Sequence, residues 1–507
     1  MIFQYVRTPS TPATLAGRGG PRFDLYKPLL APMLVCQKWH TLITQDATLW
    51  NVIDLIQCDV AGPMVQHLLE RSKAASLNVR LAYPGLVKYA YPRLVKDGRK
   101  KTTSFLKSHA HRFGILEVKL QKSDCTAKMI SLLENSMPRL KCLVISLEKE
   151  GTGKSKDVHE ISFARLPALK ELALSETLLR PKESIQSLTH LHVVRLVNDS
   201  IHSFMEALRR MPSLEVLDLQ LIRLTTGNVK QPSLVFPRLR LLRISDHSWS
   251  NSVHFLLSHL MAPSLAVVDL QNVDCWTHRN PDAVRAYIPP DLLEHRTIRM
   301  VKIKDRPSGF STGFIAVFEG PDFKISLREN RRLSDSVFSM SPLLECLDHV
   351  EDTHINICAN DSSIHPLDIL WLGAHLSRVK SLVVSCNPST LSLLTHAEPI
   401  LLPELVSLGV DVVGTEYNHC VADRLALALT ERAVLVGRPL SVLRLEGYRK
   451  LLPQLSRQTQ RSEIAAKVEI LPSSSSNHGN LWTSASFSRD VDGHGYWATT
   501  KPRGWDL

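Results

Sequence analysis

The sequence lacks a long hydrophobic run and a paired cysteine framework. The longest apolar stretch near the N-terminus, from Pro28 to Cys36, is far shorter than the ~18 residues that cross a bilayer. The nine cysteines show no pairing pattern, and most sit singly among apolar or loop residues, as reduced thiols do in proteins of reducing compartments. We therefore expect no membrane-spanning helix, no disulfide scaffold, and a cytoplasmic or nuclear location.

Recognisable catalytic and metal-binding motifs are also missing. The run from Gly151 to Ser155 resembles a phosphate-binding loop, but Glu148 occupies the position of the first glycine that such a loop requires. Cys275 and His278 have no second ligand pair nearby, whereas a structural zinc site needs four ligands. Three other histidines lie among strand and helix aliphatics and are interpreted as structural: His190, His192 and His202. The sequence thus predicts a non-catalytic protein without a cofactor or metal.

The formal net charge of +12 comes from basic residues that are dispersed along the sequence. The densest cluster, between Lys96 and Lys101, lies in a polar insertion. A solvated basic loop explains this cluster as well as a nucleic-acid site does. We therefore predict no nucleic-acid partner.

A short phrase, Pro-x-Leu-x-x-Leu-x-aliphatic, recurs through the chain and is its most informative feature. Full copies occupy 138–145, 167–174, 212–219, 237–244, 263–270 and 403–410. Another copy at 342–349 ends in His349 instead of an aliphatic residue. Weaker copies occupy 188–193, 298–303, 379–384 and 440–445. Repetition of this kind indicates stacked units that cannot bury their apolar faces alone.

The repeat period and the local patterns predict an α/β solenoid. Leu188, Leu214, Leu239 and Leu265 are 25–26 residues apart, within the ~20–29 residue period of leucine-rich repeats. In each phrase the last two aliphatics should point inward from a short strand, with the residues between them facing solvent. Apolar residues at helical spacing in 201–208 and 253–260 predict helices between strands. The expected fold is a curved leucine-rich-repeat horseshoe.

The region before the repeats has the pattern of a small helical module. Five apolar residues recur at helical spacing and predict one buried stripe: Leu34, Val35, Trp39, Leu42 and Ile43. Asp46 is positioned to cap a following turn that contains Leu49 and Trp50. Short strands are expected at 52–55 and 77–81, with an amphipathic segment around 64–69 between them.

Five regions follow from these patterns. Residues 1–22 are expected to be disordered, 23–60 to form the helical module and 61–111 a linking segment. The irregular repeat domain is expected over 112–449, with insertions at 84–105, 148–160 and 275–295. Residues 450–507 read as a flexible tail that contains several aromatic residues.

The run Val35-Cys36-x-x-Trp39, followed by Leu49-Trp50 and Ile-Asp-Leu, resembles the second half of an F-box. The version it resembles is common in F-box proteins of mushroom-forming fungi that carry C-terminal leucine-rich repeats. The segments 67–79 and 425–443 are similar to the linking segment and the closing repeat of those proteins, so the resemblance covers roughly 28–448. The Leu-Pro-x-Glu helix that opens an F-box does not precede Leu34.

The resemblance implies a substrate-recognition subunit of a Skp–cullin–F-box ubiquitin ligase, acting in ubiquitin-dependent degradation. A Skp-type adaptor would bind Leu34, Val35, Cys36, Trp39, Leu49 and Trp50. A protein client would bind the repeats, where Asp218, Asp269 and Glu345 occupy slots expected to face solvent. Trp39 and Trp50 could instead fill the core of the module, the role we expect for Leu42 and Ile43. The alternative function is a repeat scaffold that binds a protein without ligase coupling.

Overall fold

The computed structural model describes residues 31–55, 63–83, 103–120, 133–147, 159–175, 179–220, 222–225, 233–245, 252–271, 298–308, 311–321, 323–329, 350, 352–356, 376, 378–385, 391, 394–395, 400–412, 420–447 and 465–472. The chain divides into two compact units: unit 1 comprises residues 1–238 and 488–507, and unit 2 comprises residues 239–487. Each unit is built on a mostly parallel sheet with helices beside it, which confirms the predicted α/β class. None of the described helices has the length and apolarity needed to span a membrane.

Each repeat phrase forms a tight turn followed by a strand. In the copy at 138–145, the Leu140 amide donates to the Met137 carbonyl at 3.1 Å, so Pro138 is the second residue of the turn. Its fixed φ suits that position. Equivalent bonds close the turns at Leu169, Leu214, Leu265 and Leu405. The first leucine of each of these phrases is buried, so the turn seals the core beneath the strand.

The sheet of unit 1 contains seven strands among the described residues, all parallel and adjacent in chain order. They are β1 (Val52–Asp54), β2 (Leu77–Tyr83), β3 (Phe113–Leu120), β4 (Cys142–Leu147), β6 (Glu171–Ser175), β8 (His190–Val194) and β10 (Val216–Gln220). Leu143, Leu172, Leu191 and Leu217 are register partners and are buried on the core face, as predicted from the phrase.

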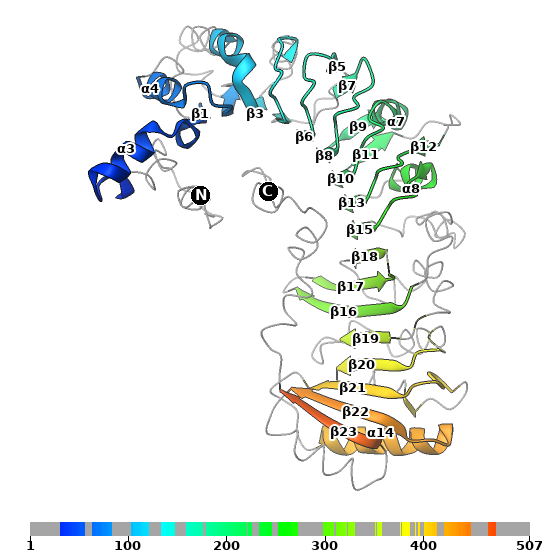
Figure 1. Ribbon diagram of the computed structural model, residues 1–507. Helices are drawn as coiled ribbons and strands as arrows, with labels where there is room; N and C mark the ends of the chain where they lie inside the picture. The colour runs from blue at the N-terminus through cyan, green and yellow to red at the C-terminus, as the bar shows by residue number, and fades with distance from the viewer. Residues whose placement is uncertain are drawn as a thin grey trace. The chain divides into compact units, whose positions relative to one another are not determined.

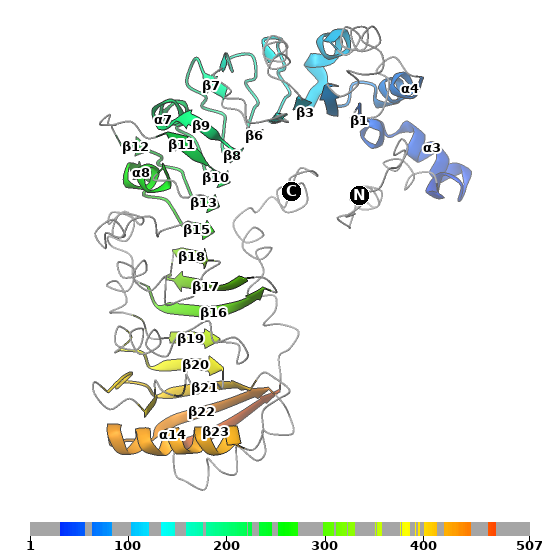
Figure 2. The same ribbon diagram turned by 180° about the vertical axis from the view of Figure 1, so that it is seen from behind.

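The remaining elements of unit 1 are short. They are α3 (Gln37–Gln45), η2 (Ala47–Trp50), α4 (Pro63–Ser72), η4 (Ala110–Arg112), β5 (His159–Ile161), β7 (Leu179–Pro181), β9 (Val197–Ser200), α7 (Ile201–Arg209), β11 (Arg223–Thr225) and β12 (Leu234–Val235). Residues 103–109 are also helical. Helices α4 and α7 lie on the same side of the sheet (Figures 1 and 2). The predicted helix at 201–208 is confirmed, and it buries Phe204 and Met205 completely.

Unit 2 contains a sheet whose order departs from chain order at one place. In spatial order, its strands are β13 (Leu241–Ser245), β15 (Val267–Gln271), β18 (Lys324–Glu329), β17 (Ser311–Glu319), β16 (Met300–Ser308), β19 (Asp352–Asn356), β20 (Ser381–Ser385), β21 (Ser407–Val412), β22 (Leu440–Gly447) and β23 (Ala465–Pro472). Only β17 is antiparallel to its neighbours in this described sheet. The other elements are α8 (Ser252–Ser258), β14 (Leu260–Met261) and α14 (Cys420–Val436).

The sheets extend beyond the limits expected from the sequence. Strand β2 lies in the predicted linking segment, yet it pairs in parallel with β1 and β3. Strand β23 lies in the predicted flexible tail and pairs with β22. The weaker phrases at 188, 298, 379 and 440 form β8, β16, β20 and β22. The phrase copy at 342–349, the N-terminal 1–22, most of the three insertions and the motifs at 151–155 and 275–278 lie outside the described residues.

Thr353 is a polar residue in a row of buried aliphatics. It pairs with Val301 and Leu382 in the core-facing register of β16, β19 and β20, and its Oγ1 is buried without a hydrogen-bond partner in the described part of the chain. A buried hydroxyl without a partner costs stability, and valine has nearly the same shape. Thr353→Val should therefore raise the free energy of unfolding of unit 2 by about 1 kcal/mol.

Urea denaturation, read by hydrogen exchange on peptides of unit 2, measures this gain. Thr430→Val is the matched control, because the Thr430 hydroxyl is exposed and donates to the Ala426 carbonyl at 2.8 Å. The control should leave stability unchanged or slightly lower. An equal gain in both variants would show that added hydrophobicity, and not the buried hydroxyl, is responsible.

Candidate functional site

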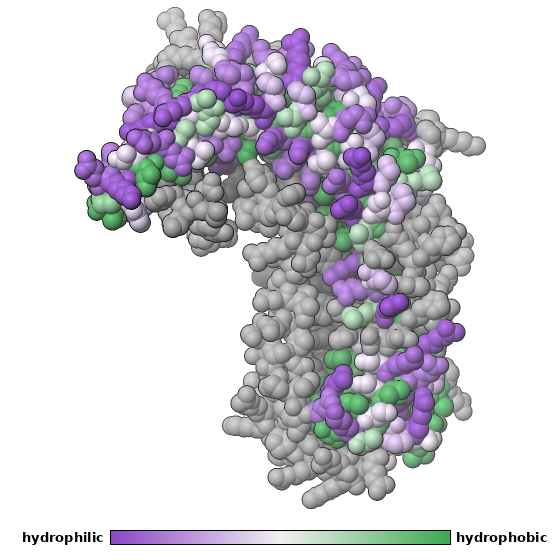
Figure 3. Space-filling view, in the orientation of Figure 1, coloured by the Kyte–Doolittle hydropathy of each residue, from purple (hydrophilic) through white to green (hydrophobic). Residues whose placement is uncertain are grey.

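The segment before β1 exposes a cluster of large apolar side chains. Leu34 is 86% exposed, Val35 66%, Leu42 49% and Trp39 38%. Trp39 and Leu42 lie on α3, and Leu34 and Val35 immediately precede it. We call these four residues the α3 face. Figure 3 shows hydrophobic residues on the surface at this end of unit 1. Single exposed apolar residues are ordinary, whereas four together form an exposed apolar patch of the kind that often marks an interaction site.

The other side of the segment anchors it to the sheet. Ile43 is completely buried, and the Trp50 Nε1 donates a hydrogen bond of 2.7 Å to its carbonyl. The Arg71 guanidinium lies 4.6 Å from the centre of the Trp50 ring, and His67 packs against the ring edge. Asp46 caps η2 as predicted, with its Oδ1 accepting from the Thr48 amide at 2.9 Å. These contacts fix α3 relative to β1 and α4.

The predicted buried stripe is therefore wrong for four of its five residues. Of Leu34, Val35, Trp39, Leu42 and Ile43, only Ile43 is buried. The core role expected for Leu42 is likewise contradicted. Helical spacing shows that apolar residues share a face, but it does not say whether that face packs on the chain's own core or on a partner.

The residues predicted to contact an adaptor separate into two groups. Leu34, Val35, Cys36 and Trp39 are exposed and accessible. Leu49 and Trp50 are only 2% and 5% exposed, so the structure does not place them on a contact surface. They belong instead to the buried anchor of α3, in which Trp50 bonds to the Ile43 carbonyl of α3 and packs against Arg71 of α4.

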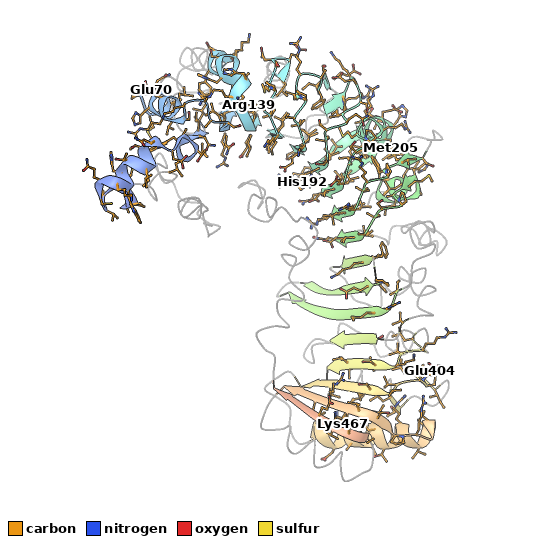
Figure 4. The ribbon with its side chains drawn as sticks, in the orientation of Figure 1. Glu70, Arg139, His192, Met205, Glu404 and Lys467 are labelled. Atoms are coloured by element: carbon orange, nitrogen blue, oxygen red, sulfur yellow. The ribbon has the colours of Figure 1, made fainter. Side chains whose placement is uncertain are left out.

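The face of the unit 1 sheet opposite the core carries polar pairs between adjacent strands. Arg80 on β2 forms two bonds to its register partner Glu117, the shorter of 2.7 Å from Nε. His192 on β8 places Nδ1 2.9 Å from Oδ2 of its register partner Asp218 (His192 is labelled in Figure 4). His190 lies close to the Thr189 hydroxyl. The structural role predicted for these two histidines is consistent with their contacts.

Between these pairs the same face holds an apolar group that the sequence analysis missed. Cys142, Val144 and Ala173 are buried, and Ile115 packs against them. The phrase predicts that residues between the inward aliphatics face solvent, and here that prediction is wrong. The signal is an apolar residue in the middle slot of two consecutive phrases, at Val144 and Ala173. Burial raises the pKa of the Cys142 thiol far above its usual range, with nearby Glu171 adding to the effect.

The predicted client-facing carboxylates are not free recognition groups. Asp269 is fully buried, and its Oδ2 lies 3.3 Å from Nε of its register partner Arg243 and accepts from Gln271 at 2.8 Å. Asp218 is largely buried against His192. In a parallel sheet the middle-slot side chains of adjacent strands stand about 4.8 Å apart, so opposite charges pair laterally. Glu345 lies outside the described residues.

Within the part of the chain that the structure describes, no group of three or more His, Cys, Asp or Glu side chains is arranged to hold a metal ion. No protein-family model matches this chain, and no protein of curated function is detectably similar to it.

Proposed function

We propose that the chain is a non-catalytic substrate-recognition subunit of a Skp–cullin–F-box ubiquitin ligase. The α3 face binds the Skp-type adaptor. The parallel strands formed by the repeat phrases, which we call the strand array, build a leucine-rich-repeat solenoid that binds a protein client. The observation that carries the proposal is the exposure of Leu34, Val35, Trp39 and Leu42 within the segment that resembles an F-box. The parallel strands formed by the repeat phrases support the repeat-domain part of the proposal.

The mechanism would be proximity. A client held on the strand array stays near a ubiquitin-charged enzyme that the adaptor recruits, so the local concentration of its lysines rises. This requires α3 to be held firmly on the client-binding domain. The anchor of Ile43, Leu49 and Trp50 supplies that link, since all three side chains are buried and Trp50 joins the end of α3 to α4 through its bond to Ile43 and its contact with Arg71.

Alanine substitutions on the α3 face test adaptor binding directly. Trp39→Ala should weaken the affinity for a purified Skp-type adaptor by about tenfold or more, because central aromatic residues dominate such interfaces. Leu42→Ala should weaken it by about three- to tenfold. Leu427→Ala is the matched control, because Leu427 is also an exposed leucine on a helix, 59% exposed on α14. Isothermal titration calorimetry measures all three.

Alkylation of Cys36 locates the contact independently. Cys36 is exposed beside Val35, whereas Cys142 is buried with a raised pKa. Iodoacetamide should label Cys36 and spare Cys142, and saturating adaptor should slow the labelling of Cys36 by about tenfold, as read by peptide mass spectrometry. Unprotected Cys36 in a formed complex would place the adaptor elsewhere.

The burial of Leu49 and Trp50 favours a second candidate function. It leaves a contact surface smaller than the F-box resemblance implies. Under this alternative the chain is a repeat scaffold that binds a protein partner without ligase coupling. A folded chain that does not bind the adaptor, with Trp39→Ala indistinguishable from the parent, would support the scaffold and contradict the ligase proposal.

A further inference from the structure

One edge of the unit 1 sheet collects basic residues that are far apart in the sequence. Four segments, 71–76, 109–112, 133–141 and 164–170, lead into the adjacent parallel strands β2, β3, β4 and β6. Since the strands are parallel and adjacent, these segments meet at the same edge of the sheet. They contain seven lysines and arginines and a single acidic residue, Glu134. The dispersed charge of the sequence is therefore concentrated by the fold.

Backbone and side-chain contacts show that these residues are neighbours. The Lys170 amide donates to the Lys141 carbonyl at 2.9 Å, so the two lysines occupy successive positions along the edge. Arg139 donates to the Ala74 carbonyl at 3.0 Å, which places it beside Lys73 (Arg139 is labelled in Figure 4). Arg165 donates to the backbone carbonyl of Glu134, not to its carboxylate. We call six of the seven basic residues, all except Arg71, the basic edge: Lys73, Arg112, Arg139, Lys141, Arg165 and Lys170.

The positive charge of the basic edge is not compensated within the described residues. Lys73, Lys141 and Lys170 are exposed, and none has an ion-pair partner among the side chains that the structure describes. Burial lowers the pKa of Arg112, and the nearby cation Arg139 lowers it further. Burial also lowers the pKa of His109, with Arg112 and His111 adding to the shift. Nearby positive charges disfavour the protonated forms of Arg112 and His109, as expected where basic side chains gather without a carboxylate between them.

We propose that the basic edge is the docking surface for an extended, acidic segment of a protein partner. This inference rests on the proposed function, in which the strand array receives a protein client. It adds the chemistry of the client segment, which is acidic. Carboxylates would pair with the exposed lysines, and electrostatic attraction would speed the encounter. The edge segments of four strands span about 15 Å, which four or five residues of extended chain can cover.

A protein segment fits these residues better than a nucleic acid. The four segments contain no Phe, Tyr or Trp, whereas proteins that bind single strands rely on aromatic side chains for base stacking. A duplex would require phosphate contacts over a larger surface than this edge provides.

The test is fluorescence anisotropy of a fluorescein-labelled octaglutamate peptide titrated with the full-length protein. The parent should bind, and raising the salt from about 0.05 M to about 0.3 M should weaken binding severalfold. The double variant Lys141→Glu/Lys170→Glu should weaken it by about tenfold or more. The matched control is Arg238→Glu/Arg240→Glu, which makes the same change of charge at exposed positions of another phrase and should change binding by less than about twofold. Thermal melts confirm that both double variants fold.

Separate outcomes overturn the inference and the proposed function. Equal weakening by both double variants, or no binding by the folded parent, would overturn the basic edge as a docking surface. Tighter binding of a labelled single-stranded DNA of equal charge, lost in the same lysine variant, would overturn the assignment to an acidic peptide. Loss of adaptor binding in Trp39→Ala with unchanged peptide binding would support both proposals. Failure of the adaptor to bind the parent would remove the ligase proposal alone.

Discussion

Trp50→Ala is expected to lower the free energy of unfolding of unit 1 by about 3–5 kcal/mol, a cost typical of removing a buried aromatic residue. Trp50 is 5% exposed, donates a hydrogen bond of 2.7 Å to the Ile43 carbonyl and packs under the Arg71 guanidinium. Alanine would leave a cavity and a buried carbonyl without its donor. Urea denaturation, with hydrogen exchange read on peptides of α3, β1 and α4, measures the loss.

Trp39→Ala provides the comparison. Trp39 is 38% exposed on α3, so its removal should cost about 1 kcal/mol or less. The two tryptophans should therefore have opposite signatures: Trp50→Ala impairs folding, and Trp39→Ala impairs adaptor binding in a folded chain. Similar losses of stability in both variants would contradict the division of this segment into an anchor and a contact face.

Arg432→Ala should destabilise unit 2 by about 2–4 kcal/mol, because a buried charged donor is lost. The Leu401 carbonyl loses its bond to the guanidinium, whereas the Leu402 carbonyl keeps the turn bond from the Leu405 amide. Arg432 lies on α14 and is 3% exposed. Its guanidinium donates to the Leu401 carbonyl at 3.3 Å and to the Leu402 carbonyl at 2.6 Å. Leu402 has a φ of 53°, a left-handed conformation that is strained for a leucine, and the bonds from Arg432 hold it there. Burial lowers the pKa of Arg432 to about 10, so the group remains charged at neutral pH.

Arg438→Ala is the matched control for this prediction. Arg438 donates to the adjacent Pro403 carbonyl at 2.9 Å, but from an exposed position where water can replace it. Its removal should cost less than about 0.5 kcal/mol. Thermal and urea unfolding, followed on peptides of β21 and α14, distinguish the two variants. Equal effects would show that α14 is held by apolar contacts and not by its arginine.

The turn-and-strand units could be predicted from the sequence because their causes are local. Proline at the second turn position and two inward aliphatics on the strand are both visible in a single phrase. The helix at 201–208 was likewise predictable, since its four apolar residues share one face and all are buried.

The features that could not be predicted depend on tertiary contacts between residues that are far apart in the sequence. The exposure of Leu34 and Trp39 depends on what packs beside α3. The burial of Asp269 depends on Arg243 being its register partner. The basic edge depends on parallel pairing of strands whose lysines are about thirty residues apart in sequence.

The reversed order of β16, β17 and β18 has a consequence for synthesis on the ribosome. A strand can join the growing sheet once the preceding strand is in place, as β2 to β10 can in turn. Strand β16 has no such neighbour, because β15 pairs with β18 and not with β16. The chain from Met300 to Glu329 must therefore emerge completely before the sheet of unit 2 grows past β15. From the end of β15 at Gln271 to the end of β18 at Glu329 the ribosome adds 58 residues. At about 5–20 residues per second the unpaired edge of β15 therefore waits for about 3–12 s, an interval in which nascent-chain chaperones would be expected to act.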